Sequence, residues 1–185
     1  MNTVGIKRLL YADTSKVTGD LTPAMLKSII DDPDTKEVTN VHQDTWSINE
    51  SETSVTRYNN QLTKKPYRQS AELGEVSMNF TIGEYDFTTK KELMGGQTIT
   101  KNGGNEVIGW KRSREYEEIN KCLMALSEDS VWIVFPKGAV VTLEAETDGA
   151  VGLAVVGTAM EPENTAISSE YWYSDKEVQS SSSIE

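Results

Sequence analysis

A two-residue turn signal, Asp148-Gly149, constrains the fold of this 185-residue chain more than any other feature. Asp-Gly favours the type I′ turn of a β-hairpin, because both central residues of that turn need a positive φ. The flanking segments, 140–147 and 150–159, alternate in residue type as strands with two distinct faces do. We expect one apolar face. The second face should carry acidic side chains on one arm and only small residues on the other. The apolar face includes Val141, Leu143 and Ala145 with Val151, Leu153 and Val155, and the second face includes Glu144 and Glu146 with Ala150, Gly152 and Ala154.

Other segments also have the patterns of strands. The segment from Glu75 to Glu84 alternates apolar and polar residues, which is typical of a half-buried strand. The run from Val131 to Phe135 is short and strongly apolar, and Val4 to Tyr11 and Ser169 to Tyr173 are further candidates. A hairpin is expected around Asn102-Gly103-Gly104. These patterns predict a chain that is mostly β.

A few helices are expected between the strands. Thr22-Pro23 opens a short helix, with threonine as the N-cap and proline at the first helical position. A capping box at Thr89 to Glu92 begins a second helix, which Gly95-Gly96 ends. Ser113 caps the strongest predicted helix, because the apolar residues that follow it recur at steps of three, four and three. That apolar stripe comprises Tyr116, Ile119, Leu123 and Leu126.

The order of these elements predicts a mainly β (α+β) fold. We expect two packed antiparallel β-sheets, sandwich-like or barrel-like, with one flanking amphipathic helix. Residues 1–165 are predicted to form this domain, with a long exposed loop at about 59–73. Residues 166–185 are predicted to add a C-terminal strand and a partly disordered tail, because the end of the chain is rich in serine.

The charge of the chain limits its partners. It has 29 acidic and 18 basic residues, giving a net charge of −11, and tight nucleic-acid binding needs basic phosphate contacts. The loop at 59–73 is a local exception, because Lys64, Lys65 and Arg68 lie there beside Tyr67. This basic loop is either an ordinary solvated loop or a docking arm, since loops longer than about 12–15 residues are often functional.

The sequence offers little for catalysis or cofactor binding. It contains one histidine, His42, and one cysteine, Cys122, so no Ser-His-Asp set, cysteine zinc site or disulfide is expected. Glu144 and Glu146 share a strand face, but nothing marks the sugar cleft that a glycosidase pair needs. No stretch is long and apolar enough for a secretory signal or a membrane span. We therefore predict no catalytic residue, metal, cofactor or membrane partner.

The order of elements resembles that of the tail tube proteins of long-tailed bacteriophages, also called major tail proteins, and their relatives in contractile injection systems. The resemblance covers about Val4 to Pro162 and is strongest from Trp110 onward. It rests on element order and composition rather than on a diagnostic motif. The segments that carry it are an N-terminal strand (Lys7 to Tyr11), a polar hairpin region from Trp46 to Glu72, "EVSMNFTIGEYDF", "VIGWKR", "YEEINKCLMALSED" and "VWIVFPKGAVVTLEAETDGAVGLAVVGTAMEP".

This resemblance implies a structural protein that forms hexameric rings, which stack into a tube in the virion tail after synthesis in the host cytoplasm. Its implied partners are further copies of itself, a tape-measure protein, and tail-terminator and initiator proteins, while DNA passes through without specific binding. Glu144 and Glu146 are candidates for the lumen surface, where they would repel phosphates. Alternatively, the small residues Ala150, Gly152 and Ala154 lie beneath the helix predicted at Tyr116 to Leu126 and let it approach the sheet. The candidate inter-ring loop comprises Lys64, Lys65, Tyr67 and Arg68. Two alternatives stay open: a secretion tube protein of the type VI kind, and a monomeric β-sandwich binding module that would use Tyr171, Trp172 and Tyr173.

Overall fold

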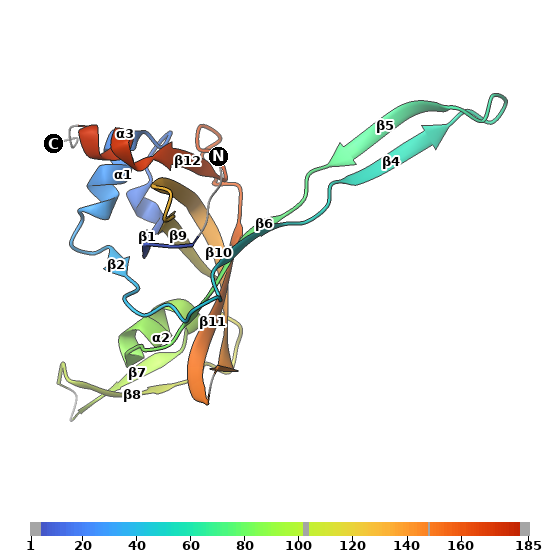
Figure 1. Ribbon diagram of the computed structural model, residues 1–185. Helices are drawn as coiled ribbons and strands as arrows, with labels where there is room; N and C mark the ends of the chain where they lie inside the picture. Colours follow the sequence, from blue (N-terminus) through green and yellow to red (C-terminus); the bar gives the residue numbers. More distant parts are fainter. Residues whose placement is uncertain (1–4, 102–103, 148, 182–185) are drawn as a thin grey trace.

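The computed structural model describes residues 5–101, 104–147 and 149–181. It consists of a folded body and a long two-stranded arm that projects from it (Figure 1). Strands dominate the body, so the predicted β-rich α+β class is confirmed. The elements in chain order are β1 (Arg8–Asp13), η1 (Thr14–Lys16), α1 (Pro23–Ile30), β2 (Lys36–Glu37), β3 (Ser47–Glu50), β4 (Ser54–Asn59), β5 (Pro66–Glu72), β6 (Val76–Ile82), α2 (Phe87–Met94), β7 (Gln97–Thr100), β8 (Val107–Lys111), β9 (Ile119–Leu126), β10 (Val131–Thr147), β11 (Ala150–Ala159), β12 (Tyr171–Ser174) and α3 (Asp175–Ser180).

One eight-stranded antiparallel sheet organises the body, in the order β2-β1-β9-β10-β11-β6-β3, with β12 also paired to β10. The 17-residue β10 makes this possible, because β12 pairs with its first part and β11 with its second. Residues 36–42 then run from the free edge of β1 to β6. The backbone N–H of Val38 donates to Leu9 O (2.8 Å), and that of His42 donates to Thr81 O (2.8 Å). The main sheet is therefore continuous and barrel-like, and the described residues do not form the two packed sheets that the sequence predicted; β4-β5 and β7-β8 are separate two-stranded sheets.

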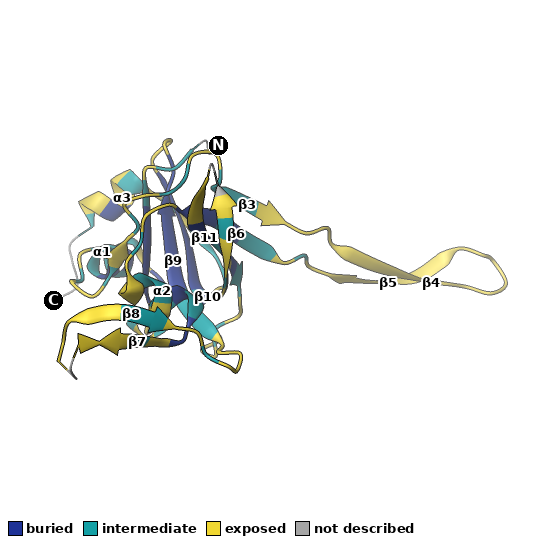
Figure 2. Cartoon of the chain, turned by 90° about the horizontal axis from the view of Figure 1, so that it is seen from below, coloured by how far each residue is buried: buried dark blue, intermediate teal, exposed yellow. Residues whose placement is uncertain are grey.

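Both faces of the central strands are buried, as the dark strands β9 and β10 in Figure 2 show. The inner cluster lies inside the curved sheet and joins β1, β9 and β10 to β6 and β11. The outer cluster lies on the other face of the sheet, beneath α1 and α3. Burial of so much apolar surface is the main stabilising contribution to such a fold. The inner cluster includes Leu9, Phe80, Leu123, Phe135 and Leu153, and the outer cluster includes Leu10, Leu26, Met124, Trp132 and Val178.

The helix predicted after Ser113 is wrong, because residues 119–126 form the central strand β9. Leu123 belongs to the inner cluster and Leu126 to the outer one, while Tyr116 lies outside the strand and is 80% exposed. These residues therefore share no common face. A strand that is buried on both sides is apolar at successive positions, and such a run contains helical spacings by coincidence.

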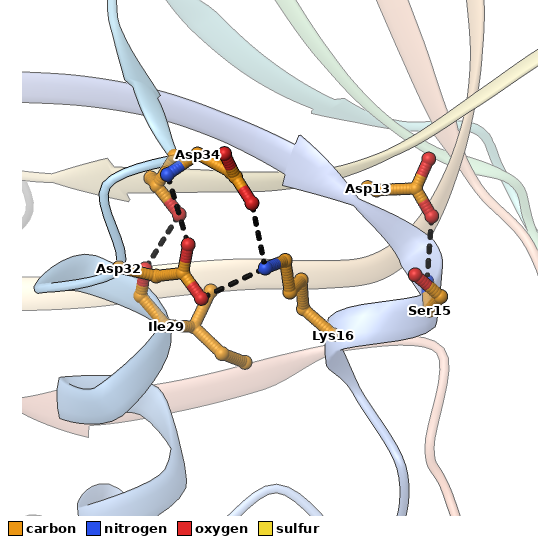
Figure 3. Close-up of polar contacts among 7 residues, drawn as sticks. Asp13, Ser15, Lys16, Ile29, Asp32 and Asp34 are labelled. Atoms are coloured by element: carbon orange, nitrogen blue, oxygen red, sulfur yellow. Dashed lines mark hydrogen bonds and ion pairs between the residues drawn. The ribbon is translucent and has the colours of Figure 1, made fainter.

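The predicted helix at Thr22-Pro23 is confirmed as α1, with Thr22 Oγ1 accepting a hydrogen bond from the Met25 N–H at 3.2 Å. Figure 3 shows how the turn after α1 is fixed to η1. The Lys16 ammonium group donates to Asp32 (2.8 Å) and to Asp34 (3.2 Å). The Lys16 ammonium holds the pKa of Asp32 below its usual value, mainly through this hydrogen bond.

The predicted helix around Thr89 also forms, but its boundary differs. Asp86 is the N-cap of α2, and its carboxylate accepts a hydrogen bond from the Thr89 N–H at 2.7 Å. The helix therefore begins at Phe87, and Gly95 ends it with φ of 77°, as the sequence predicted. The predicted hairpin between β7 and β8 is present, although Asn102 and Gly103 lie outside the described residues.

The loop expected at 59–73 is largely wrong, because Pro66–Glu72 form strand β5 and pair with β4. Its exposure was correctly predicted, and the paired strands β4 and β5 lie within the polar hairpin region that was expected from Trp46 to Glu72. At the other end of the chain the predicted strand is present as β12. A partly disordered tail was expected within residues 166–185, yet helix α3 continues there to Ser180; residues 182–185 lie outside the described residues.

Candidate interaction surfaces

The β10–β11 hairpin has a different face pattern from the one that the sequence predicted. Thr147 pairs with Ala150, so the predicted two-residue turn is present and Gly149 has φ of 79°; Asp148 itself lies outside the described residues. Cross-strand partners share a face, which places Leu143 with Ala154 and Glu144 with Leu153. The predicted pairing of the two apolar arms on one face is therefore wrong. A turn between 147 and 150 already fixes these partners, so the sequence contained this information.

This register leaves an apolar stripe on the outer face of the hairpin. Leu143 is 63% exposed, and Val141 and Val156 are also exposed. The helix that was expected at 116–126 does not form and so does not cover the stripe, because residues 119–126 are strand β9. Contiguous exposed apolar residues on a sheet face indicate an interaction surface. The stripe comprises Val141, Leu143, Ala154 and Val156, of which Ala154 is half-buried.

Glu144 has a local structural role that the sequence analysis missed. Its carboxylate accepts a hydrogen bond from Lys90 Nζ on α2 at 2.5 Å and lies 3.4 Å from Arg112. Lys90 in turn lies 4.4 Å from the ring centre of Trp110, a cation–π distance. The Lys90 hydrogen bond holds the pKa of Glu144 below its usual value. The contact therefore fixes α2 and the β7–β8 hairpin to β10, and it neutralises much of the charge that was expected to repel phosphates.

Glu146, the second lumen candidate, lies near the hairpin tip and is exposed. It pairs in register with Val151, which is also exposed. Its carboxylate is thus available at the surface, and its orientation toward a lumen stays a prediction.

The β4–β5 hairpin forms an exposed arm, defined as residues 54–72. Each of its residues is exposed, as the yellow arm in Figure 2 shows. Two-stranded hairpins are marginally stable in water unless they pack against something. The four residues predicted for the inter-ring loop, Lys64, Lys65, Tyr67 and Arg68, all lie in this arm. The guanidinium of Arg68 is 5.7 Å from the Tyr58 ring centre.

The arm tip is held in a defined conformation by Asn60. Its side-chain oxygen accepts hydrogen bonds from the N–H groups of Leu62 (2.8 Å) and Thr63 (3.2 Å). Its backbone N–H donates to Lys65 O (2.8 Å), and its carbonyl accepts from the Lys64 N–H (2.9 Å). These bonds present Leu62 at the apex, where it is 91% exposed. The tip is therefore an ordered apolar and basic element.

Charge is strongly segregated between arm and body. The arm contains four basic residues and one acidic residue, a net charge of +3. Because the whole chain carries −11, the rest of it carries −14. The basic residues of the arm are Arg57, Lys64, Lys65 and Arg68, and the acidic residue is Glu72.

An open groove lies on the body beside the start of β3, and we call it the Trp46 groove. Its apolar lining includes Ile6, Trp46, Ile48 and Trp172, and its charged lining residues are Asp44 and Glu128. Trp46 Nε1 is buried and has no hydrogen-bond acceptor among the described residues. The groove thus combines apolar side chains with negative charge.

The aromatic cluster expected for a binding module does not form a surface patch. Tyr171 and Tyr173 stack at a centroid distance of 6.1 Å and pack against the outer cluster. The Tyr171 hydroxyl donates to Asp20 (2.7 Å), and the Tyr173 hydroxyl donates to Leu21 O. Trp172 alone of the three is exposed, at 43%. The packing of two of the three rings removes the main argument for that alternative.

The described residues contain no group of three His, Cys, Asp or Glu side chains that could hold a metal ion. Cys122 is fully buried in the outer cluster, and burial raises the pKa of its thiol to about 12. In the part of the chain that the structure covers, no helix is long and apolar enough to cross a membrane. No family model and no curated protein sequence matches this chain.

Proposed function

We propose that this chain is a structural subunit that assembles as stacked hexameric rings into a tube, as the tail tube proteins of long-tailed bacteriophages do. The observation that carries the proposal is the arm, an ordered hairpin that is exposed along its whole length. Such an element gains stability when a neighbouring subunit covers it. In an assembly of identical subunits every arm meets an equivalent surface.

The apolar stripe on β10–β11 supports the same proposal. A stripe that includes Val141, Leu143 and Val156 is a liability in an isolated chain, since exposed apolar sheet faces promote association. Lateral contact between copies within a ring would bury it. The proposed partners are further copies of the chain and the tape-measure, terminator and initiator proteins of a tail. DNA would pass without specific binding, and the proposed location is the virion tail.

The test is negative-stain electron microscopy of the purified chain across a concentration series, beside an arm-deletion variant. Ser51 N–H donates to Glu75 O (2.9 Å), so β3 and β6 are still paired where the arm begins. Replacing residues 52–74 by Asn-Gly therefore closes a hairpin without disturbing the body. We expect rings or tubes from the full chain and dispersed particles from the variant.

A folded control is required for that comparison. Urea unfolding of the variant should match that of the full chain, because no cluster residue lies between 52 and 74. Rings that form equally well without the arm would contradict its assigned role. A full chain that stays monomeric at every concentration would contradict self-assembly of the isolated subunit and favour a binding module.

A further inference from the structure

The arm tip and the Trp46 groove are complementary in chemistry. The tip exposes the apolar side chain of Leu62, and the basic residues Lys64 and Lys65 follow it in the sequence. The groove presents apolar side chains together with Asp44 and Glu128, and no lysine or arginine is among its described lining residues. Apolar contact can thus form at the centre, with opposite charges around it, which is the usual anatomy of a protein interface.

A second groove on the body is a poorer match. It lies beside α2, and its lining includes Lys36 as well as carboxylates. Three of its four carboxylates already have partners: Glu37 pairs with Arg8 at 2.9 Å, Asp86 accepts a hydrogen bond from the Thr89 N–H at 2.7 Å, and Glu92 accepts one from the Tyr11 hydroxyl at 2.7 Å. In the Trp46 groove, by contrast, no described lysine or arginine lines the surface beside Asp44 and Glu128.

The arm does not reach the groove of its own chain. The strand from residue 54 to residue 59 spans roughly 17 Å at about 3.3 Å per residue, and residue 62 lies beyond its end. The arm also points away from the body in both views (Figures 1 and 2). The groove lies at the root of the arm, since Ser47 and Ile48 of β3 line it. Contact between tip and groove therefore joins two copies.

We propose that the arm tip of one copy, with Leu62 at its apex and Lys64 and Lys65 beside it, docks into the Trp46 groove of a second copy. The inference rests on the proposed self-assembly and names the contact surface that it uses. Because the tip and the groove are different patches, the contact is heterologous and propagates from copy to copy. The tip is pre-ordered by Asn60, which lowers the entropy cost of docking.

Charge reversal tests the pairing. The arm variant is Lys64→Asp/Lys65→Glu, where aspartate suits the positive φ of 58° at position 64. The groove variant is Asp44→Asn/Glu128→Lys, where asparagine suits the φ of 60° at position 44. A matched control for the arm variant, Lys91→Asp/Lys176→Glu, makes the same change in net charge as that variant but on exposed helix positions.

Sedimentation velocity at low salt measures the effect. We expect the arm and groove variants each to associate at least about tenfold more weakly than the unmodified chain, because like charges then meet. The control should associate normally. A mixture of the arm and groove variants should regain association, since each then offers opposite charge to the other. Equal association by all variants, or a mixture without recovery, overturns the proposal.

Disulfide trapping tests the contact independently of affinity. The variant Leu62→Cys/Gln43→Cys places one thiol at the tip and one on an exposed residue of the groove lining, while Cys122 stays buried. Oxidation should give a ladder of linked multimers, and the control variant Leu62→Cys/Lys91→Cys should not. Equal ladders from both variants, or none from the first, overturn the proposal.

The outcomes separate this contact from the proposed tube. Rings or tubes that form without a tip–groove ladder support the proposed tube and overturn the proposed contact. A ladder without rings or tubes supports the contact and contradicts the tube. Absence of any multimer overturns both. Binding of a labelled DNA duplex that the arm variant loses, while its self-association is unchanged, assigns the basic tip to nucleic acid and overturns the contact.

Discussion

Leu123 packs against Gly157, so the effect of Gly157→Ala on stability should depend on whether the Leu123 side chain is present. A Cβ added at Gly157 would lie 2.1 Å from Leu123 Cδ1, far inside van der Waals contact. Leu123 is fully buried in the inner cluster, so its side chain cannot swing into solvent. Gly157→Ala should therefore overpack the core.

The magnitude follows from two opposing effects. Overpacking a well-packed core costs about 1–3 kcal/mol. Replacing a strand glycine by alanine recovers about 0.5–1 kcal/mol, because the unfolded chain loses freedom. We expect Gly157→Ala to lower the free energy of unfolding by up to about 2.5 kcal/mol. For a chain of this size each 1 kcal/mol lowers Tm by about 2–4 °C.

Urea unfolding followed by tryptophan fluorescence measures this change, since Trp132 is fully buried. Leu123→Ala alone should cost about 2–5 kcal/mol by leaving a cavity. In that background Gly157→Ala should become neutral or stabilising, because the clashing methyl is gone. Gly109→Ala is the matched control, with its nearest added contact at an ordinary 3.5 Å. A Gly157→Ala cost that persists without the Leu123 side chain would refute the reasoning.

Three further predictions concern caps, the thiol and a buried indole. The Thr89 N–H bond lowers the pKa of Asp86, so Asp86 stabilises α2 above about pH 4 and less as pH falls through its folded value. Asp86→Ala should thus lower the free energy of unfolding by about 1 kcal/mol at pH 7, measured by urea unfolding. A difference between the variant and the unmodified chain that stays constant down to pH 2.5 would contradict this. Cys122 should not react with Ellman's reagent at pH 8 until denaturant is added, and rapid reaction of the native chain would contradict its burial. Trp132→Phe removes the 2.8 Å hydrogen bond to Asp175, and the expected loss of about 1–3 kcal/mol should shrink in an Asp175→Ala background.

Local signals in the sequence predicted several elements correctly. Thr22-Pro23 fixes the start of α1 because both residues act within one turn of the chain. The alternation in 75–84 predicts β6, which buries Met78, Phe80 and Ile82 on its core face. The hairpin at Asp148-Gly149 also follows from local backbone preference.

The tertiary structure decided what these signals left open. Residues 119–126 are a strand because neighbours on both faces bury them, and an apolar run alone does not distinguish that strand from a helix. Glu144 is tied to α2 by Lys90, a contact between residues 54 positions apart that no local pattern encodes. The Trp46 groove likewise gathers residues from both ends of the chain. Turns and caps are thus set by local backbone chemistry, whereas surfaces depend on which distant segments the packing brings together.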